Sequence, residues 1–443
     1  MKPFHNTLKA DEHEAPGRPV ALDRWWTAFD DPIMTRIIER ALTQNLELTA
    51  ALARVQRARA VAEEAGAQRQ PAASFAAQAV QLRQSLYSPV GIIASQYPGY
   101  ARNQSLYDVG AGASWESDLF GQLRRGAEAA QALAEAAEAD GIGVRLTVAA
   151  EAADAYLEIR GAQARLQIAQ DQVTIDQRLL DLVRLRLADG AASGREVAQA
   201  DALTAQALSV LPTLRIGLEA QMNRLDVLMG AQPGSHSQEL DAPRPLDTLR
   251  ARPVTISADE LLRRRPDVIA AERRLAATNA QIGAALAEYY PKVSVSALLG
   301  FESLGAAHLL SGTGFQPQAV AGLRWRLFDF GRVDAEVRQA RAANAEALAQ
   351  YRQSVLRAAG DVENAVTAFV QIQNRSGELA HELTALGRAR DLSQEDYLEG
   401  SSALTDVLDA DRELLTARDE YAASQVATAQ AVVAIYRASG GGW

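Results

Sequence analysis

The sequence contains no cysteine and no long run of apolar residues. A chain without thiols forms no disulfide, holds no metal through thiolates and has no cysteine nucleophile. Because no stretch approaches the roughly 20 consecutive apolar residues with which a helix spans a bilayer, a role inside a membrane would require β-strands. The lack of cysteine suits an oxidising compartment and the cytosol equally well.

Proline, large aromatic residues and positive charge are also scarce. Only 15 prolines, 9 phenylalanines and 5 tryptophans occur among 443 residues, which favours an elongated protein over several conventional compact cores. A net charge of -10 argues against a nucleic-acid partner, because phosphate binding requires a concentrated basic surface. A short basic run, Arg263 to Arg265, is interpreted as the solvated start of a helix.

The sequence offers no constellation for catalysis, a cofactor or a metal ion. No Gly-rich phosphate loop is visible, and the histidines lack the paired helical spacing of a metal site; they are His5, His13, His236, His308 and His381. We therefore predict that the protein is not an enzyme and assign it no cofactor. Alanine and interspersed charges are abundant instead, a composition typical of long helices.

An internal repeat organises the chain. The segment from Trp115 to Gly121 resembles the segment from Trp325 to Gly331, and the two lie 210 residues apart (325 minus 115). Upstream, residues 42–71 match residues 262–291 at a spacing of 220 (262 minus 42). The first copy therefore has a longer segment between Pro71 and Trp115, where turn-forming residues predict a surface loop.

Each copy is predicted to contain a very long helix, a tight turn and a second helix. In the second copy, seam residues alternate spacings of three and four, which is typical of a coiled coil; they are Asn344, Leu348, Tyr351, Val355, Ala358, Val362, Ala365, Phe369 and Ile372. No proline lies between Gly331 and Glu399. We therefore expect one helix of roughly 70 residues there, on the order of 100 Å long.

These patterns predict an N-terminal extended segment, two repeats and a linker between them. The extended segment covers 1–32, the first repeat 33–230, the linker 231–258 and the second repeat 259–438. After its short helices, the first repeat has strands at about 73–87 and 105–116, a long helix at about 121–189 and a helix at about 194–230. The second has a helix at about 266–290, strands at about 292–302 and 316–327, a long helix at about 331–399 and a helix at about 403–438.

Most of the predicted strands alternate apolar and polar residues, so that one face of each is apolar. In the strand at about 73–87, Gln81 and Arg83 interrupt that face. The candidates for a lipid-facing surface are Tyr107, Val109, Trp115, Val293, Val295, Phe301, Leu323 and Trp325. Such strands fit a transmembrane barrel or, equally well, a soluble hairpin packed on a helix.

The number of strands limits the membrane interpretation. Four strands cannot close, and open sheet edges are not tolerated in hydrocarbon because their backbone groups would stay unpaired. A membrane role therefore requires several chains, and a trimer would supply twelve strands around a lumen. The same trimer would set the long helices side by side as a second, helical barrel.

Four motifs in this order resemble the TolC family of outer-membrane efflux proteins, in particular its lipoprotein branch that serves resistance-nodulation-division pumps and includes NodT-like and OprM-like proteins. The resemblance spans about residues 20 to 437. The motifs are Trp25 to Pro32, Arg264 to Val268, Tyr290 to Lys292 and Trp325 to Gly331. The duplicated frame that carries them makes the combination specific.

The resemblance implies a mainly α-helical chain with a transmembrane β-barrel portion, assembled as a homotrimer. A 12-stranded barrel in the outer membrane would continue into a long α-helical barrel in the periplasm, with the linker in an equatorial belt. The implied partners are outer-membrane lipid, a periplasmic adaptor (membrane fusion) protein and an inner-membrane pump of the resistance-nodulation-division type. The channel would be a passive exit duct for drugs or other small toxic compounds. Members of this branch begin with a signal peptide and a lipid-bearing cysteine, which this numbering lacks.

The resemblance also indicates where the tube would narrow at its periplasmic end. Tyr397, Asp409 and Arg412 match gate positions, and Thr405 matches the usual constriction site. A ring of Asp409 from three chains would favour cations. The alternative is an ordinary helix-face pair of Asp409 with Arg412. Gly190 and Gly400 are candidates for docking the adaptor, or are turn glycines only.

Other functions remain open at this stage. A type I secretion channel would share the same frame. A periplasmic or cytoplasmic coiled-coil scaffold would leave the alternating strands unexplained, and a periplasmic adaptor would have one helical hairpin rather than two.

Overall fold

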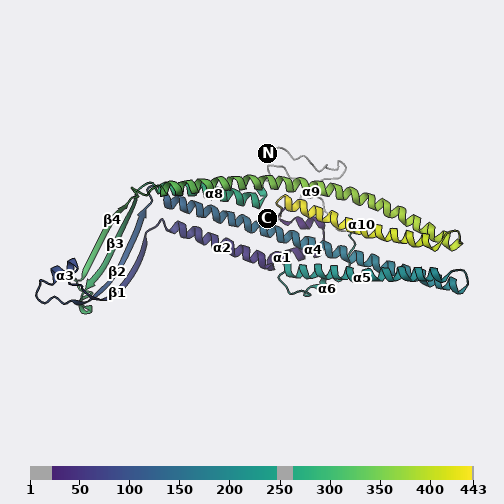
Figure 1. The fold of residues 1–443 in the computed structure, drawn as a ribbon, viewed down its shortest axis with the longest axis horizontal. Helices are drawn as coiled ribbons and strands as arrows, with labels where there is room; N and C mark the ends of the chain where they lie inside the picture. Colours follow the sequence, from purple (N-terminus) through teal and green to yellow (C-terminus); the bar gives the residue numbers. More distant parts are fainter. Residues whose placement is uncertain (1–21, 247–262, 442–443) are drawn as a thin grey trace. The chain divides into compact units, whose positions relative to one another are not determined.

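The computed structural model describes residues 22–246 and 263–441, and these divide into two compact units (Figure 1). The first unit contains the described residues up to Arg54, together with 138–270 and those from Arg352 onwards. The second contains 55–137 and 271–351. Residues 1–21 of the expected extended segment and 247–258 of the expected linker lie outside the described residues.

Long helices dominate the first unit. It holds η1 (Leu22–Phe29), α1 (Pro32–Gln44), α5 (Gly194–Leu228), α6 (Ser237–Leu240) and α10 (Leu404–Ala438). It also holds the starts of α2 (Leu46–Ala67) and α8 (Pro266–Ala287) and the later parts of α4 (Gln122–Ala188) and α9 (Arg332–Glu399). Tight turns join α4 to α5 and α9 to α10, which makes two helical hairpins (Figure 1).

The second unit combines helices with one antiparallel sheet. The sheet has the order β1-β2-β3-β4, formed by β1 (Ala72–Arg83), β2 (Asn103–Ser117), β3 (Lys292–Ser303) and β4 (Phe315–Arg324). The short helix α3 (Pro89–Ala94) lies between β1 and β2, and the single turn η3 (Ala306–His308) lies between β3 and β4. Neighbouring strands from the two halves of the sequence, β2 and β3, pair in the middle of this sheet.

Six of the eight described glycines with positive φ form pairs at the 210-residue spacing. They are Gly121 and Gly331, Gly190 and Gly400, and Gly230 and Gly440. Each pair follows or precedes a long helix at the corresponding place in the two halves of the chain. Among the described residues, no helix is long and apolar enough to cross a membrane.

The segment before Pro32 is not extended where the structure describes it. Leu22–Phe29 form the 3-10 helix η1, which buries Trp25, Trp26 and Phe29. The Trp25 ring stacks on Tyr436 of α10 with ring centroids 5.4 Å apart. Burial of three large aromatic side chains favours this compact turn over an extended strand.

Element ends also differ from those expected. β1 ends at Arg83 rather than near 87, because the chain turns toward Ser88, whose hydroxyl caps α3. β4 covers Phe315–Arg324, so Trp325 and Leu327 lie beyond the sheet. The helix expected to reach 290 ends at Ala287, where a turn precedes Pro291.

Side chains join the ends of helices that are remote in sequence. In the first unit, the Asn45 amide donates to the Leu228 carbonyl (2.9 Å), where α5 ends beside the start of α2. Arg265 donates to the Ala438 carbonyl (3.1 Å), where α10 ends beside the start of α8. These bonds satisfy C-terminal carbonyls that have no partner within their own helix.

Candidate functional site

The strand register places most of the large apolar residues of the four strands on one face of the sheet. Val109 pairs with Phe301, Trp115 pairs with Val295, and Val293 pairs with Leu323. Directly paired residues of antiparallel strands share a face, and Tyr107 belongs to the same face as Val109. The sheet thus gathers seven of the eight residues predicted to face lipid, and Trp325 follows directly after β4.

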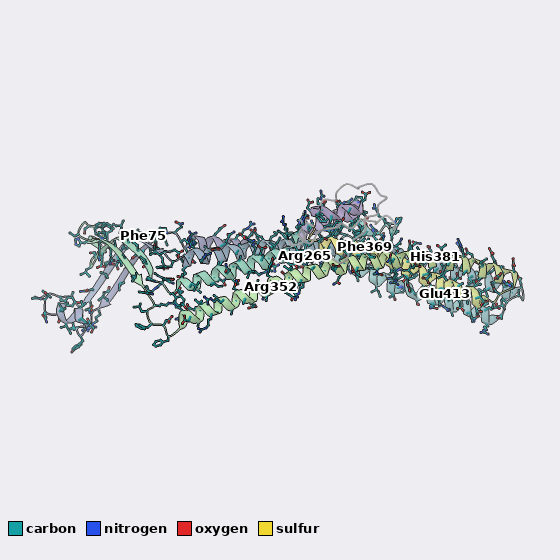
Figure 2. The ribbon with its side chains drawn as sticks, turned by 90° about the horizontal axis from the view of Figure 1, so that it is seen from above. Phe75, Arg265, Arg352, Phe369, His381 and Glu413 are labelled. Atoms are coloured by element: carbon teal, nitrogen blue, oxygen red, sulfur yellow. The ribbon has the colours of Figure 1, made fainter. Side chains whose placement is uncertain are left out.

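This apolar face remains exposed in the single chain. Phe75 is 73% exposed, Leu299 62% and Leu323 68%, and Figure 2 labels Phe75 on the sheet. The opposite face is more polar, with Asp108, Glu302 and Gln318, although it also carries Leu298 and Val320. An exposed apolar patch of this kind marks a surface that another molecule or lipid covers.

The two tryptophans predicted to face lipid also fix the sheet to its helices. The Trp115 indole donates to the Arg69 carbonyl (3.0 Å), and the Trp325 indole donates to the Tyr289 carbonyl (3.0 Å). The acceptor Arg69 lies just after the end of α2, and the acceptor Tyr289 lies just after the end of α8. Each ring therefore has a polar end bonded to the backbone and an apolar body that is about half exposed.

The turns of the two hairpins are sharp and open to solvent. Gly190 has φ of +72° and Gly400 has φ of +80°. A Cβ added to either glycine would meet no atom within 4 Å, so backbone conformation rather than space requires glycine here. Both features are those of turn glycines at helix C-termini.

Three of the four gate candidates lie on one exposed face of α10. Thr405, Asp409 and Arg412 are exposed, at positions spaced by four and three along the helix. Arg412 donates to Asp409 (2.9 Å), so the helix-face pair forms within the chain. The sequence alone left this pair and a ring of Asp409 as alternatives.

Tyr397 lies apart from the other three, in a buried cluster between the hairpins. Its ring is 4% exposed and packs with Leu179 and Val183 of α4 and with Leu404, Val407 and Leu408 of α10. Burial raises the pKa of its hydroxyl, against the charge of Arg186. Arg186 stacks on the ring at 4.5 Å and donates to the Tyr397 carbonyl (3.1 Å). No local sequence pattern predicts this contact, because Arg186 belongs to the other hairpin.

Arg265 is not solvated, contrary to the interpretation of its basic run. Its guanidinium donates to Asp267 (2.7 Å) and to Asp361 of α9 (2.8 Å), and its side chain is 11% exposed. The two carboxylates hold its pKa above the ordinary value despite burial. Figure 2 labels this residue among the helices. Within the described ranges, no group of His, Asp and Glu residues is arranged to hold a metal ion.

The comparisons with known proteins agree with this geometry. The family model "Outer membrane efflux protein" matches residues 37–231 and 258–441. The pyoverdine export outer membrane protein OpmQ of Pseudomonas putida is 33% identical over 422 residues, which cover 95% of this chain and 88% of that protein. OpmQ of Pseudomonas aeruginosa is also 33% identical, over 97% of this chain and 90% of that protein.

A solved structure has the same fold. The outer-membrane channel OprN superposes with a TM-score of 0.88 at 34% sequence identity, and the match covers 96% of this chain and 94% of that chain.

Proposed function

Because this chain belongs to the outer membrane efflux protein family and is an outer-membrane channel component of an efflux system, not an enzyme, we propose that three copies form a passive exit duct for small toxic compounds. The division into repeats 33–230 and 259–438, joined by the linker 231–258, belongs to this proposal. So do its partners, a periplasmic adaptor protein and an inner-membrane pump of the resistance-nodulation-division type.

The observation that carries the proposal is the sheet with one largely apolar face and one more polar face. Its edges, β1 and β4, have no partner strand among the described residues, and hydrocarbon does not tolerate unpaired edges. Pairing β4 of one copy with β1 of the next removes every edge after three copies, with twelve strands in the wall. The apolar face then meets lipid and the polar face lines the lumen.

The gate belongs to the hairpin ends. In a trimer, the exposed face of α10 from each of three copies would meet around an axis. This would bring three Asp409 side chains together and impose a negative potential on a narrow passage. Thr405 would narrow the same passage one turn away, and Tyr397 would hold α9 against α4. The exposed turns at Gly190 and Gly400 would be the docking points for the adaptor.

The assembly is tested by the mass of the oligomer extracted in detergent from the outer-membrane fraction. After the mass of bound detergent is subtracted, we expect the mass of three chains, 3 times 47.6 kDa. A monomer that stays in solution without detergent would overturn the proposal.

The Asp409 ring is tested by the charge reversal Asp409→Lys in planar bilayers. Loss of cation preference in the reversal potential is expected, because three positive charges replace three negative charges. Glu420→Lys, farther along α10, is the matched control and should change ion preference much less. Equal shifts for both variants would rule out a ring at Asp409.

A further inference from the structure

Two acidic side chains are buried between the hairpins. Asp176 of α4 is 1% exposed and Asp411 of α10 is 2% exposed. One oxygen of each is satisfied, since Gln172 donates to Asp176 (2.7 Å) and Arg390 of α9 donates to Asp411 (2.8 Å). The other oxygen of each, Oδ2, is buried and has no hydrogen-bond partner among the described residues. Two buried charged carboxylates in this state would be strongly unfavourable.

The charges around the pair are few. On α9, Arg390 binds Asp411 and also Asp391 (3.2 Å). On α5, Asp201 is exposed and reaches Arg184 of α4 rather than the pair. One helical turn nearer the hairpin ends, the surroundings become the apolar cluster around Tyr397. Arg390 therefore neutralises Asp411, no ion pair reaches Asp176 among the described residues, and a proton is left to neutralise Asp176.

The proton belongs on Asp176. Burial raises the pKa of this carboxyl to about 6 against the hydrogen bond from Gln172, and the charge of Asp411 adds to the rise. Asp411 is the member that the guanidinium neutralises. A protonated Asp176 is neutral and removes its repulsion with the charge of Asp411.

The acidic pair is not repeated at the corresponding positions of the other halves of the two repeats. The counterpart of Asp411 at the 210-residue spacing is Asp201, whose side chain is 66% exposed. The position 210 residues after Asp176 is Leu386. The acidic pair is therefore not a feature that the duplication imposed on both halves, but one specific to the contact of α4 with α10.

We propose that Asp176 and Asp411 form a proton-binding latch between the two hairpins, which is closed when Asp176 holds a proton and weakened when both carboxylates are charged. A raised folded pKa means that this stabilisation is fully present below the ordinary aspartate pKa near 4 and is lost as pH rises through about 6. Its consequence for conduction rests on the proposed function, because only a gated duct would need the hairpins to separate.

The latch is tested on the full chain by the distance between the two hairpin turns. Spin labels on Ala191→Cys and Ser401→Cys, in assemblies diluted with unlabelled chain, report this distance within one copy, and the absence of native cysteine keeps the labelling specific. We expect a narrow distribution at pH 5 that broadens to longer distances at pH 7.5, with a midpoint near pH 6. An identical distribution at both pH values would overturn the latch.

Substitutions separate the latch from general effects of pH. Asp176→Asn, which mimics the protonated acid, should give the narrow distribution at both pH values, and its thermal midpoint should exceed the wild type at pH 7.5 but not at pH 5. Asp201→Asn is the matched control and should keep the wild-type response. A response to pH in Asp176→Asn equal to that of the wild type would also contradict the proposal. Neither the spin-label distance nor the thermal midpoint depends on transport. Failure of the latch proposal is therefore distinguishable from failure of the proposed function.

Discussion

At the residue scale, the contacts that hold one helical hairpin to the other come from a few side chains. Arg186 is one of them, since it stacks on Tyr397 and donates to its carbonyl oxygen. A partly desolvated cation–π contact contributes about 1–2 kcal/mol, and a hydrogen bond contributes about 1 kcal/mol more. The planar guanidinium makes both contacts at once, which a lysine ammonium does not reproduce.

We therefore predict that Arg186→Ala and Arg186→Lys both loosen the hairpin ends. The single-channel conductance in planar bilayers should rise several-fold for the alanine variant and less for lysine. Arg184→Ala is the control, because Arg184 makes only exposed contacts with Asp181 and Asp201. If all three variants conduct like the wild type, the stacked pair does not hold the gate.

Asp154 of α4 supplies a prediction on pH dependence. Burial raises its pKa to about 6 against the charges of Arg224 and Arg437, while Glu158 and Glu151 add to the rise. The native state thus binds this proton more tightly than the unfolded chain, so its stabilisation is present below pH 4 and lost as pH rises through 6. Asp154→Asn should raise stability at pH 8 by about 1–2 kcal/mol, since partial exposure reduces the effect.

The measurement is the thermal midpoint of the purified oligomer at pH 4 and at pH 8. The difference between Asp154→Asn and the wild type should be clear at pH 8 and should vanish at pH 4. A gain of the same size at both values would mean that packing, not ionisation, explains the effect.

At the element scale, the two hairpins differ in how their second helices begin. In α5, Ser193 caps the helix and exchanges hydrogen bonds with Glu196. The corresponding residue of α10, 210 positions later (403 minus 193), is Ala403, which has no side-chain oxygen. Asp406 still accepts from the Ala403 amide, at 3.3 Å. Half of a capping box is therefore missing in α10.

We predict that Ala403→Ser stabilises the start of α10 by about 1 kcal/mol, because serine supplies the missing cap. Hydrogen exchange of the first turn of α10 should slow about fivefold. In the reverse experiment, Ser193→Ala should speed exchange in the first turn of α5 by a similar factor. Unchanged exchange in both variants would show that packing alone orders these helix ends.

Periodicity is strong enough to predict long elements but not their ends. The seam residues Ala358, Val362 and Phe369 are buried in the helix α9, as a 3.5-residue period requires. The helix η1 was missed because three aromatic residues within five positions match neither a helical nor a strand period. The end of β4 was missed because Trp325 donates to a carbonyl 36 residues away, a contact that no local pattern reports.

The candidate site could be predicted only where its residues carry a local sequence signal. Glycine at the hairpin turns and alternation in the strands are local signals, so Gly190, Gly400 and the apolar face could be predicted. Arg186 contacts Tyr397 across 211 residues of sequence, and Asp176 and Asp411 lie on different hairpins. Nothing in their immediate sequence distinguishes them from the exposed charges beside them.

At the scale of the whole molecule, the family resemblance is confirmed by the comparisons. The fold supports the proposal that several copies act together. Its sheet presents an apolar face on strands whose outer edges lack partners within the chain. In the proposed trimer, association of copies through these edges would cover the backbone groups and leave the apolar face for lipid.

Cross-linking of these sheet edges tests the central claim most directly. Cysteine at Ala77 of β1 would be combined in turn with cysteine at Ala319, Ala321 or Leu323 of β4, in a chain that has no other thiol. A disulfide forms only where the two Cα atoms lie within about 7 Å. The account predicts that oxidation in outer membranes gives a covalent trimer for at least one pair, and that neither single variant does so. Chains that remain monomeric for every pair would contradict it.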